Sequence, residues 1–192
     1  MRSNNNSSNF AVALYNSDGS LDTTFSSDGK IVVGGQSNGD LVLGRFNANC
    51  TADTTFDSDG IATADLGGTV RINALLTQSD GTIVAAGSKD SDFVISRFTG
   101  AGALDTAFGA SGGYTDTYIN STSTAYALAR QADGKFVAAG RSSGSFGIAR
   151  YTAGGILDTT FDSDGKVTTS IGGISGGECD RSLCRALSVE WV

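Results

Sequence analysis

A ten-residue segment, LDTTFDSDGK at residues 157–166, recurs along the chain and limits what the chain can fold into. Near copies stand at 21–30 (LDTTFSSDGK) and 52–60 (ADTTFDSDG), and a looser one at 104–109 (LDTAFG). A catalytic motif is usually needed once per site, so four copies in 192 residues indicate an architectural repeat. The aromatic residues of the copies are spaced by 31, 52 and 53 residues: Phe25, Phe56, Phe108 and Phe161. A period of about 50 residues is typical of a propeller blade.

Each complete period contains four strand-like runs. In the best-preserved unit they are GYTDTYIN (113–120), TAYALARQ (124–131), KFVAAGR (135–141) and FGIARYT (146–152). Turns such as QADGK separate them, and Asp-Gly fits a tight hairpin. The chain has no Pro and 27 Gly, and all but two of its 20 acidic residues are Asp, which favours turns over helices. The sequence therefore predicts an all-β fold: a β-propeller-like array of about three four-stranded antiparallel blades, as a partial or open propeller.

In this interpretation, the repeated LDTTF segment connects consecutive blades. It follows the fourth strand of one blade and precedes the first strand of the next, so its aromatic residue should be buried between two sheets. An arginine precedes the repeated aspartate by eight residues in three units, which predicts a structural Arg–Asp pair in each: Arg45 and Asp53, Arg97 and Asp105, Arg150 and Asp158. Cys50 stands where the aligned turns have Gly19, Gly102 and Gly155, and a cysteine is strained there if the position requires a positive φ.

The DSDG turns at 57–60 and 162–165 offer pairs of carboxylates two residues apart: Asp57, Asp59, Asp162 and Asp164. Carboxylate oxygens are ligands that Ca²⁺ prefers, so these residues are a candidate calcium site. The motif is much shorter than an EF-hand loop and lacks a distal Glu, and a plain Asp-Gly turn is the preferred interpretation. Apart from Ca²⁺, no cofactor and no catalytic residue is predicted.

Composition excludes several classes of function. The chain has no His, which removes Ser-His-Asp and Cys-His catalysis and His-ligated metal sites. Its formal net charge is -7, and no basic face for a nucleic acid is evident. No apolar run is long enough to cross a bilayer, so membrane insertion is not expected. Cys179 and Cys184 could close a disulfide or remain separate thiols.

The combined motifs resemble the delta-60 repeat. They are the aromatic strand ends GRFN and IARYT, then LDTTF with a following GK, and then YALARQADGK with VAAG. This resemblance covers residues 10 to about 173 and implies a bacterial β-propeller-like domain of unknown function. The family occurs in long secreted or surface-attached proteins and offers no established catalytic residue to transfer. One departure is that the Q-x-DGK turns carry Ser79 and Ala132 where the family commonly has Pro.

We expect three parts: a polar N-terminal tail at 1–9, the repeats at 10–173, and a divergent partial blade at 174–192. The first unit lacks about 22 residues, because LDTTFSSDGK runs directly into IVVGGQSNGDLVLGRFN at 31–47. Propellers typically close with about four to eight blades. The chain is therefore expected to be a fragment of a longer protein, an open array, or part of a closed oligomer. Its unpaired edges and faces predict self-association.

The leading functional hypothesis is a non-enzymatic binding or scaffold module of a bacterial surface or secreted repeat protein, with a glycan or protein ligand. Repetition, the lack of His and short loops without a unique polar cluster favour it. The alternative is a carbohydrate-active enzyme, a hydrolase or lyase, that uses a pair of Asp carboxylates. An extracellular or cell-surface location would require a leader outside this chain, since residues 1–10 lack the apolar core of a signal peptide; otherwise the protein is cytoplasmic.

Overall fold

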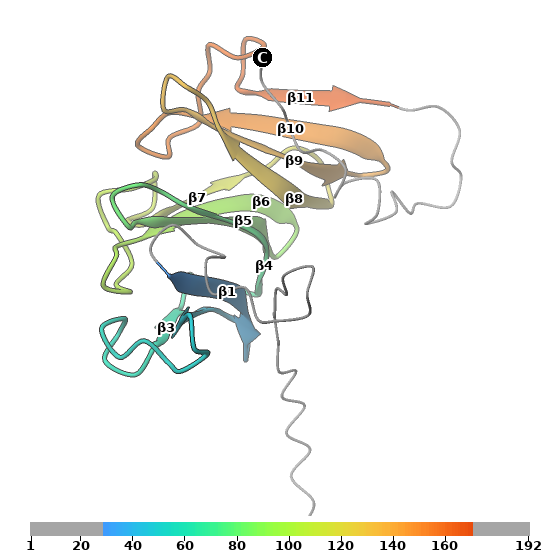
Figure 1. Ribbon diagram of the computed structural model, residues 1–192. Helices are drawn as coiled ribbons and strands as arrows, with labels where there is room; N and C mark the ends of the chain where they lie inside the picture. Colours follow the sequence, from blue (N-terminus) through green and yellow to red (C-terminus); the bar gives the residue numbers. More distant parts are fainter. Residues whose placement is uncertain (1–28, 171–192) are drawn as a thin grey trace, which may run out of the picture.

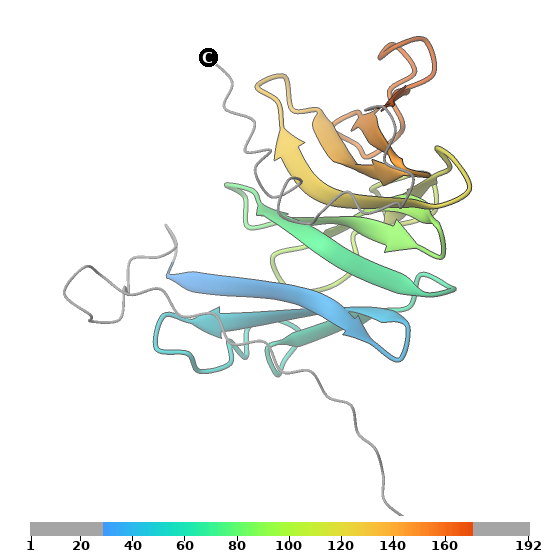
Figure 2. The ribbon, with the colours of Figure 1, turned by 90° about the vertical axis from the view of Figure 1, so that its right-hand side faces the viewer.

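The computed structural model describes residues 29–170, which form three antiparallel β-sheets stacked one above another (Figures 1 and 2). Short runs rich in Val, Ile, Ala and aromatic residues form the strands, and turns containing Gly, Asp or Asn separate them. The strands are β1 (Lys30–Ser37), β2 (Asp40–Asn47), β3 (Ile61–Ala64), β4 (Val70–Thr77), β5 (Ile83–Lys89), β6 (Asp92–Phe98), β7 (Tyr114–Thr117), β8 (Ser123–Arg130), β9 (Phe136–Ser142), β10 (Ser145–Tyr151) and β11 (Lys166–Thr169).

Each sheet is a simple meander in which strands that are consecutive in the sequence pair with each other. Sheet 1 has the order β1-β2-β3, sheet 2 the order β4-β5-β6-β7, and sheet 3 the order β8-β9-β10-β11. The predicted all-β array of about three blades is therefore confirmed, with three strands rather than four in sheet 1 within the described residues. No helix in residues 29–170 is long and apolar enough to cross a membrane.

The predicted position of the repeated segment in the fold is wrong. We call the loops that contain it the connectors. They join the last two strands of one sheet rather than two sheets, so Tyr114–Thr117 pairs with β6 and not with β8. Each connector folds back on the strand before it; for example, the Asp105 N–H donates to the Arg97 carbonyl over 2.8 Å. In an up-and-down meander every strand has two antiparallel neighbours in sequence, so the repeat alone does not show where a sheet ends. The connectors span 48–60, 99–113 and 152–165.

Two apolar cores lie between the three sheets. Leu41, Leu43 and Phe56 of sheet 1 and its connector pack against Ile83 and Phe98 of sheet 2. The second core lies between sheets 2 and 3 and contains aromatic and aliphatic residues, among them Phe93, Ile95, Phe108, Phe136 and Tyr151. Phe56 and Phe108 are fully buried, as predicted, whereas Phe161 is only half-buried because no described sheet lies beyond sheet 3.

Short crossing loops carry the chain from one sheet to the next. Residues 65–69 lead from β3 to β4, and residues 118–122 lead from β7 to β8. β4 and β8 begin after these loops and are the first strands, at one edge, of sheets 2 and 3. We call them the inner strands and this edge the inner edge. Sheet 1 has no corresponding inner strand among the described residues, which agrees with the residues missing from the first unit.

Cys50 adopts a left-handed conformation with φ of 63°, and the equivalent Gly102 and Gly155 have φ of 95° and 80°. The positive φ at this position is confirmed, and this conformation is unfavourable for a residue with a Cβ. We expect Cys50→Gly to raise the free energy of unfolding by about 0.5–1 kcal/mol, after allowance for the greater freedom of glycine in the unfolded chain.

Urea denaturation checks this prediction, with Gly102→Ala as the control. A Cβ at Gly102 would lie 3.0 Å from the Asp57 backbone nitrogen, so that variant should lose stability. A lower denaturation midpoint for Cys50→Gly would contradict the strain.

The terminal predictions fall outside the described residues. The tail at 1–9, the partial blade at 174–192, Phe25, and the Cys179–Cys184 pairing are all in this group. They stay predictions.

Candidate functional site

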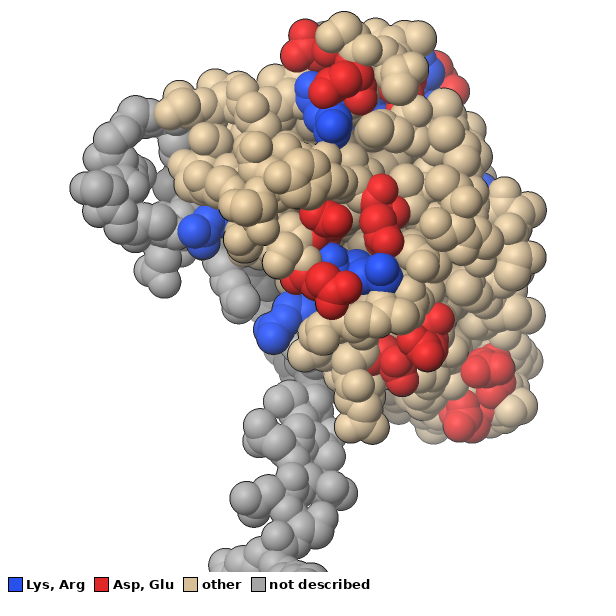
Figure 3. Space-filling view, turned by 180° about the vertical axis from the view of Figure 1, so that it is seen from behind, with Lys and Arg blue, Asp and Glu red and all other residues tan. Residues whose placement is uncertain are grey.

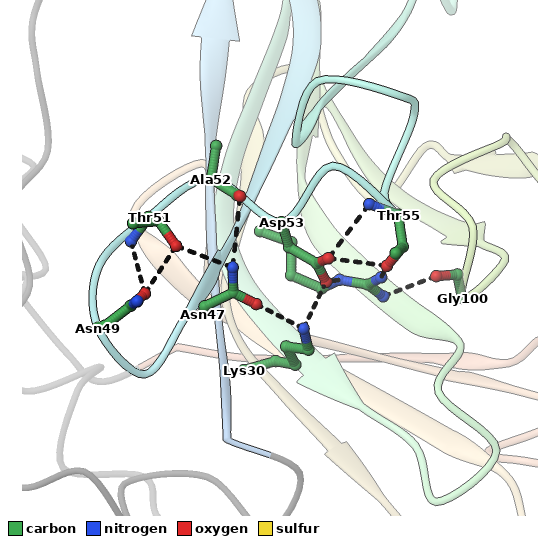
Figure 4. Close-up of polar contacts among 9 residues, drawn as sticks. Lys30, Asn47, Asn49, Thr51, Ala52, Asp53, Thr55 and Gly100 are labelled. Carbon is green, nitrogen blue, oxygen red and sulfur yellow. Dashed lines mark hydrogen bonds and ion pairs between the residues drawn. The ribbon is translucent and has the colours of Figure 1, made fainter.

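Every connector is held to its sheet by an ion pair between arginine and aspartate, as the eight-residue spacing predicted. The Arg Nε donates to the Asp Oδ2 over 2.7, 2.7 and 2.8 Å in Arg45–Asp53, Arg97–Asp105 and Arg150–Asp158. Figure 4 shows the first of these groups, in which Asp53 also accepts from the backbone and side chain of Thr55 and lies 3.1 Å from the Lys30 Nζ. The aspartate is thus the centre of a small polar network.

The arginines also join one unit to the next. The guanidinium carbon of Arg97 lies 4.6 Å from the centroid of the Phe108 ring. Arg45 stacks in the same way on Phe56, and Arg150 on Phe161. Arg45 donates to the Gly100 carbonyl of the next connector over 2.6 Å. The repeated Arg, Asp and Phe therefore form one structural group that orders the connector and fixes it between sheets.

Buried hydrogen bonds lower the pKa of two connector aspartates. The Thr55 hydroxyl is the largest cause for Asp53, and Lys30 and Arg45 add to it. For Asp158 the largest cause is the Thr160 hydroxyl, and Lys135 is the next.

These shifts predict a loss of stability in acid. Because folding lowers the pKa of Asp53 and Asp158 below their ordinary value of 3.8, both groups contribute stability above that pH. As the pH falls below about 4, the unfolded chain binds protons that the folded chain resists, and the contribution is lost. Denaturation midpoints measured from neutral pH to about pH 2 should therefore fall most steeply at the acidic end.

The control for this prediction is the double variant Thr55→Ala with Thr160→Ala. It removes the largest cause of each pKa shift and should flatten the acidic part of the curve. An unchanged slope would mean that other groups cause the acid sensitivity.

The four aspartates proposed for calcium have roles in turn geometry. Asp57 and Asp162 both have φ of 46°, a conformation that Asp tolerates better than most residues. Asp59 and Asp164 accept hydrogen bonds from the backbone N–H groups of Ile61 and Lys166, two residues further on. Within residues 29–170, no three carboxylate or thiol groups lie close enough together to hold a metal ion. Calcium binding stays a prediction, and the turn roles explain these residues without it.

A second polar group lies at one end of sheet 2 and occurs once within residues 29–170. We call it the sheet 2 cluster, and it comprises Lys89, Asp92, Tyr114, Asp116 and Tyr118. The Lys89 Nζ donates to the Asp116 Oδ2 over 2.9 Å and lies 5.6 Å from the centroid of the Tyr114 ring. Strand register places the side chains of Lys89, Asp92 and Asp116 on the same side of the sheet. Tyr118 directly follows β7 and is 64% exposed.

The crossing loop at 65–69 lies against this end of sheet 2. The Tyr114 hydroxyl donates to the Leu66 carbonyl over 3.0 Å, and the Thr69 N–H donates to Asp90 Oδ1 over 2.9 Å. These bonds fix Tyr114 and the hairpin turn at Asp90. The cluster is therefore built on ordered backbone.

The surroundings of the cluster shift the pKa of two of its residues, Asp92 and Lys89. Burial raises the pKa of Asp92 above its usual range, and the negative charges of Asp116 and Asp90 add to the effect. The hydrogen bond to Asp116 raises the pKa of Lys89, so Lys89 carries its positive charge at neutral pH. Figure 3 shows the back of the molecule, where acidic side chains lie in several separate groups with basic side chains beside some of them. Charge on this face is thus mostly arranged as local groups.

The sequence alone did not predict this cluster, because four of its five residues lie at or next to strand ends and not in loops. The signal that could have revealed it is departure from the repeat. At the position of Asp116 the other sheets have Thr63 and Thr168, and at the position of Tyr118 they have Asp65 and Ser170. The strand register needed to bring Lys89 beside Asp116 became evident only with the pairing of β5, β6 and β7.

Comparison with known families gives one match. A family described as "Domain of unknown function (DUF5122) beta-propeller" matches residues 1–25, 26–56, 78–108 and 131–161, together more than half of the chain. Each matched segment ends at the aromatic residue of a repeated connector motif: Phe25, Phe56, Phe108 and Phe161. No curated protein matches the chain.

Proposed function

We propose that this chain, which belongs to the DUF5122 β-propeller family (the delta-60 repeat family), is a non-enzymatic binding or scaffold module that acts outside the cell or at a bacterial cell surface. The single observation that carries the proposal is the sheet 2 cluster, since its combination of residues occurs in only one of three otherwise equivalent sheets within the described residues. Architecture explains residues that recur in every unit, whereas it does not require this cluster.

The chemistry of the cluster suits a glycan. Asp116 and Lys89 supply a hydrogen-bond acceptor and donors, and the exposed ring of Tyr118 supplies an apolar surface with a polar tip. Sugar rings present hydroxyl groups at their rims and C–H groups on their faces, which matches this set. The ligand class is a proposal by chemical complementarity, because the fold alone does not define a ligand.

Binding to a panel of immobilised polysaccharides tests the proposal. The parent chain should be retarded in affinity electrophoresis by at least one of them, and Tyr118→Ala or Asp116→Asn should weaken the retardation. Ile156→Ala is the matched control, because Ile156 is also an exposed apolar residue but lies in a connector of sheet 3. Equal retardation of all variants, or none for the parent chain, would count against glycan binding at this cluster.

A carbohydrate-active enzyme remains the second candidate, favoured by one observation. Asp92 has a raised pKa and lies near Asp116, which accepts a hydrogen bond from Lys89. Two neighbouring carboxyl groups, one of them with a raised pKa, are the pattern that glycoside hydrolases use. Release of reducing ends from a polysaccharide by the parent chain, but not by Asp92→Asn, would favour the enzyme over the binding module.

A further inference from the structure

Sheets 1 and 3 each have one apolar face that no described sheet covers. We call the face of sheet 2 that packs on sheet 1 its front face and the opposite face its rear face, and use the same terms for the equivalent faces of sheets 1 and 3. The front face of sheet 1 consists of half-buried residues of β1 and β2: Ile31, Val33, Val42 and Phe46. The equivalent residues of sheet 2 are fully buried against sheet 1: Ile83, Ala85, Val94 and Phe98. Sheet 1 thus keeps the apolar character of a face that, one unit further on, is packed against a sheet.

The rear face of sheet 3 has the matching property. It consists of half-buried residues of β9 and β10: Val137, Ala139, Phe146 and Ile148. The equivalent residues of sheet 2 are fully buried against sheet 3: Val84, Ala86, Phe93 and Ile95. Between sheets 1 and 2, and again between sheets 2 and 3, the rear face of one sheet packs against the front face of the next. The two uncovered faces, one front and one rear, are therefore the two sides of this same contact.

The inner edge of sheet 1 also has a glycine, Gly35, at the position where sheets 2 and 3 need one to pair with an inner strand. In sheets 2 and 3 the inner strand bulges at Asn73 and Tyr126, opposite Gly87 and Gly140. A Cβ on Gly87 would lie 1.8 Å from the Arg71 carbonyl oxygen, and one on Gly140 would lie 2.0 Å from that of Thr124. Only glycine permits this close approach. β1 has Gly35 at the same position, although no described strand pairs with that edge.

Residues 182–189, SLCRALSV, have the sequence pattern of an inner strand. Ala186 and Leu187 correspond to Ala74 and Leu75 of β4 and to Ala127 and Leu128 of β8. In the existing sheets, Leu75 is opposite Ala85 and Leu128 is opposite Ala138. The same register on β1 would place Leu187 opposite Val33.

We propose that two copies of the chain associate head to tail. The rear face of sheet 3 in one copy packs on the front face of sheet 1 in the next, and residues 182–189 of the first copy form the fourth strand of the second copy's sheet 1. A second copy is the favoured partner because each crossing loop leads onward to the inner edge of the next sheet. The chain's own sheet 1 lies beyond sheet 2. Such a contact extends the array or closes a ring.

Disulfide trapping tests the proposed register. Two single-cysteine chains, Val33→Cys and Leu187→Cys, are prepared in a background of Cys50→Ser, Cys179→Ser and Cys184→Ala, then mixed and oxidised. Directly opposite residues in a sheet lie within disulfide range, so the mixture should give a linked heterodimer on a non-reducing gel. Val32→Cys is the matched control, because its side chain points to the other face of β1; it should link several-fold less, roughly fivefold or more.

Two outcomes would overturn the proposal. One is equal or absent linking for Val33→Cys and Val32→Cys. The other is an internal disulfide at monomer mass, in dilute solution, in a chain that carries both Val33→Cys and Leu187→Cys, since that would place the segment on its own β1.

Light scattering gives a readout that does not depend on added cysteines. The parent chain should exceed the monomer mass of 19.5 kDa. Phe146→Asp, on the rear face, should return the mass to the monomer value while the β-sheet circular dichroism is unchanged. A parent chain that stays monomeric at high concentration, or a folded variant that still associates, would refute head-to-tail association.

Discussion

Replacing Phe108 by alanine should lower the free energy of unfolding by about 3–5 kcal/mol, the usual loss for a fully buried phenylalanine. Phe108 is 0% exposed, packs edge to face on Phe136 with ring centroids 6.0 Å apart, and lies under the Arg97 guanidinium. The substitution leaves a cavity between sheets 2 and 3 and removes the ring on which Arg97 stacks. Urea denaturation measures the effect, and an unchanged midpoint would show that Phe108 does not join the two sheets.

Phe161→Ala is the matched control for Phe108→Ala. Phe161 occupies the same position in its connector, and Arg150 stacks on it in the same way, but it is only half-buried. Its loss should therefore cost less stability at a protein concentration low enough to keep the chain monomeric. Equal losses for the two variants under those conditions would mean that burial between sheets does not set the difference.

Asp158→Ala should lower the free energy of unfolding clearly, because removal of one partner of an ion pair leaves the other charges without compensation. Asp158 is 7% exposed and holds Arg150 at 2.8 Å and Lys135 at 3.1 Å. It also accepts from the backbone and hydroxyl of Thr160. Without the carboxylate, the part-exposed cations Arg150 and Lys135 lose their counter-charge and the connector loses its anchor.

The second unit provides the comparison for Asp158→Ala. There the connector has Ala107 in place of the threonine and Thr82 in place of the lysine, so Asp105 keeps Arg97 and one backbone N–H. Asp105 is also 21% exposed. Asp105→Ala should therefore cost clearly less than Asp158→Ala in thermal or chemical denaturation. If the two losses were equal, the added threonine and lysine would contribute nothing.

Much of this fold could be predicted because its determinants repeat. The recurrence of Phe, Arg and Asp in fixed spacing predicts the number of sheets, the burial of Phe56 and Phe108, and the ion pairs. The left-handed turn at Cys50 could be predicted because glycine occupies the same place in the three other aligned turns.

The location of the sheet boundaries could not be predicted in this way. Tyr114–Thr117 could pair antiparallel with either of its neighbouring strands in the sequence, β6 or β8, and the sequence pattern is the same for both pairings. The backbone bonds that fold residues 99–113 back onto β6 decide the matter. The sheet 2 cluster was missed for a related reason: Lys89 and Asp116 are far apart in sequence and meet only through the pairing of three strands.

The pairing of β7 with β6 puts the repeating unit of the sequence out of phase with the repeating unit of the fold. A period of about 53 residues that begins and ends at the connector motifs carries strands of two neighbouring sheets rather than one whole sheet. A copy cut out at the boundaries of the sequence repeat would therefore hold parts of two incomplete sheets. When such an array gains or loses a sequence repeat, the strands of that repeat belong to two neighbouring sheets. No single repeat is therefore an autonomous folding unit.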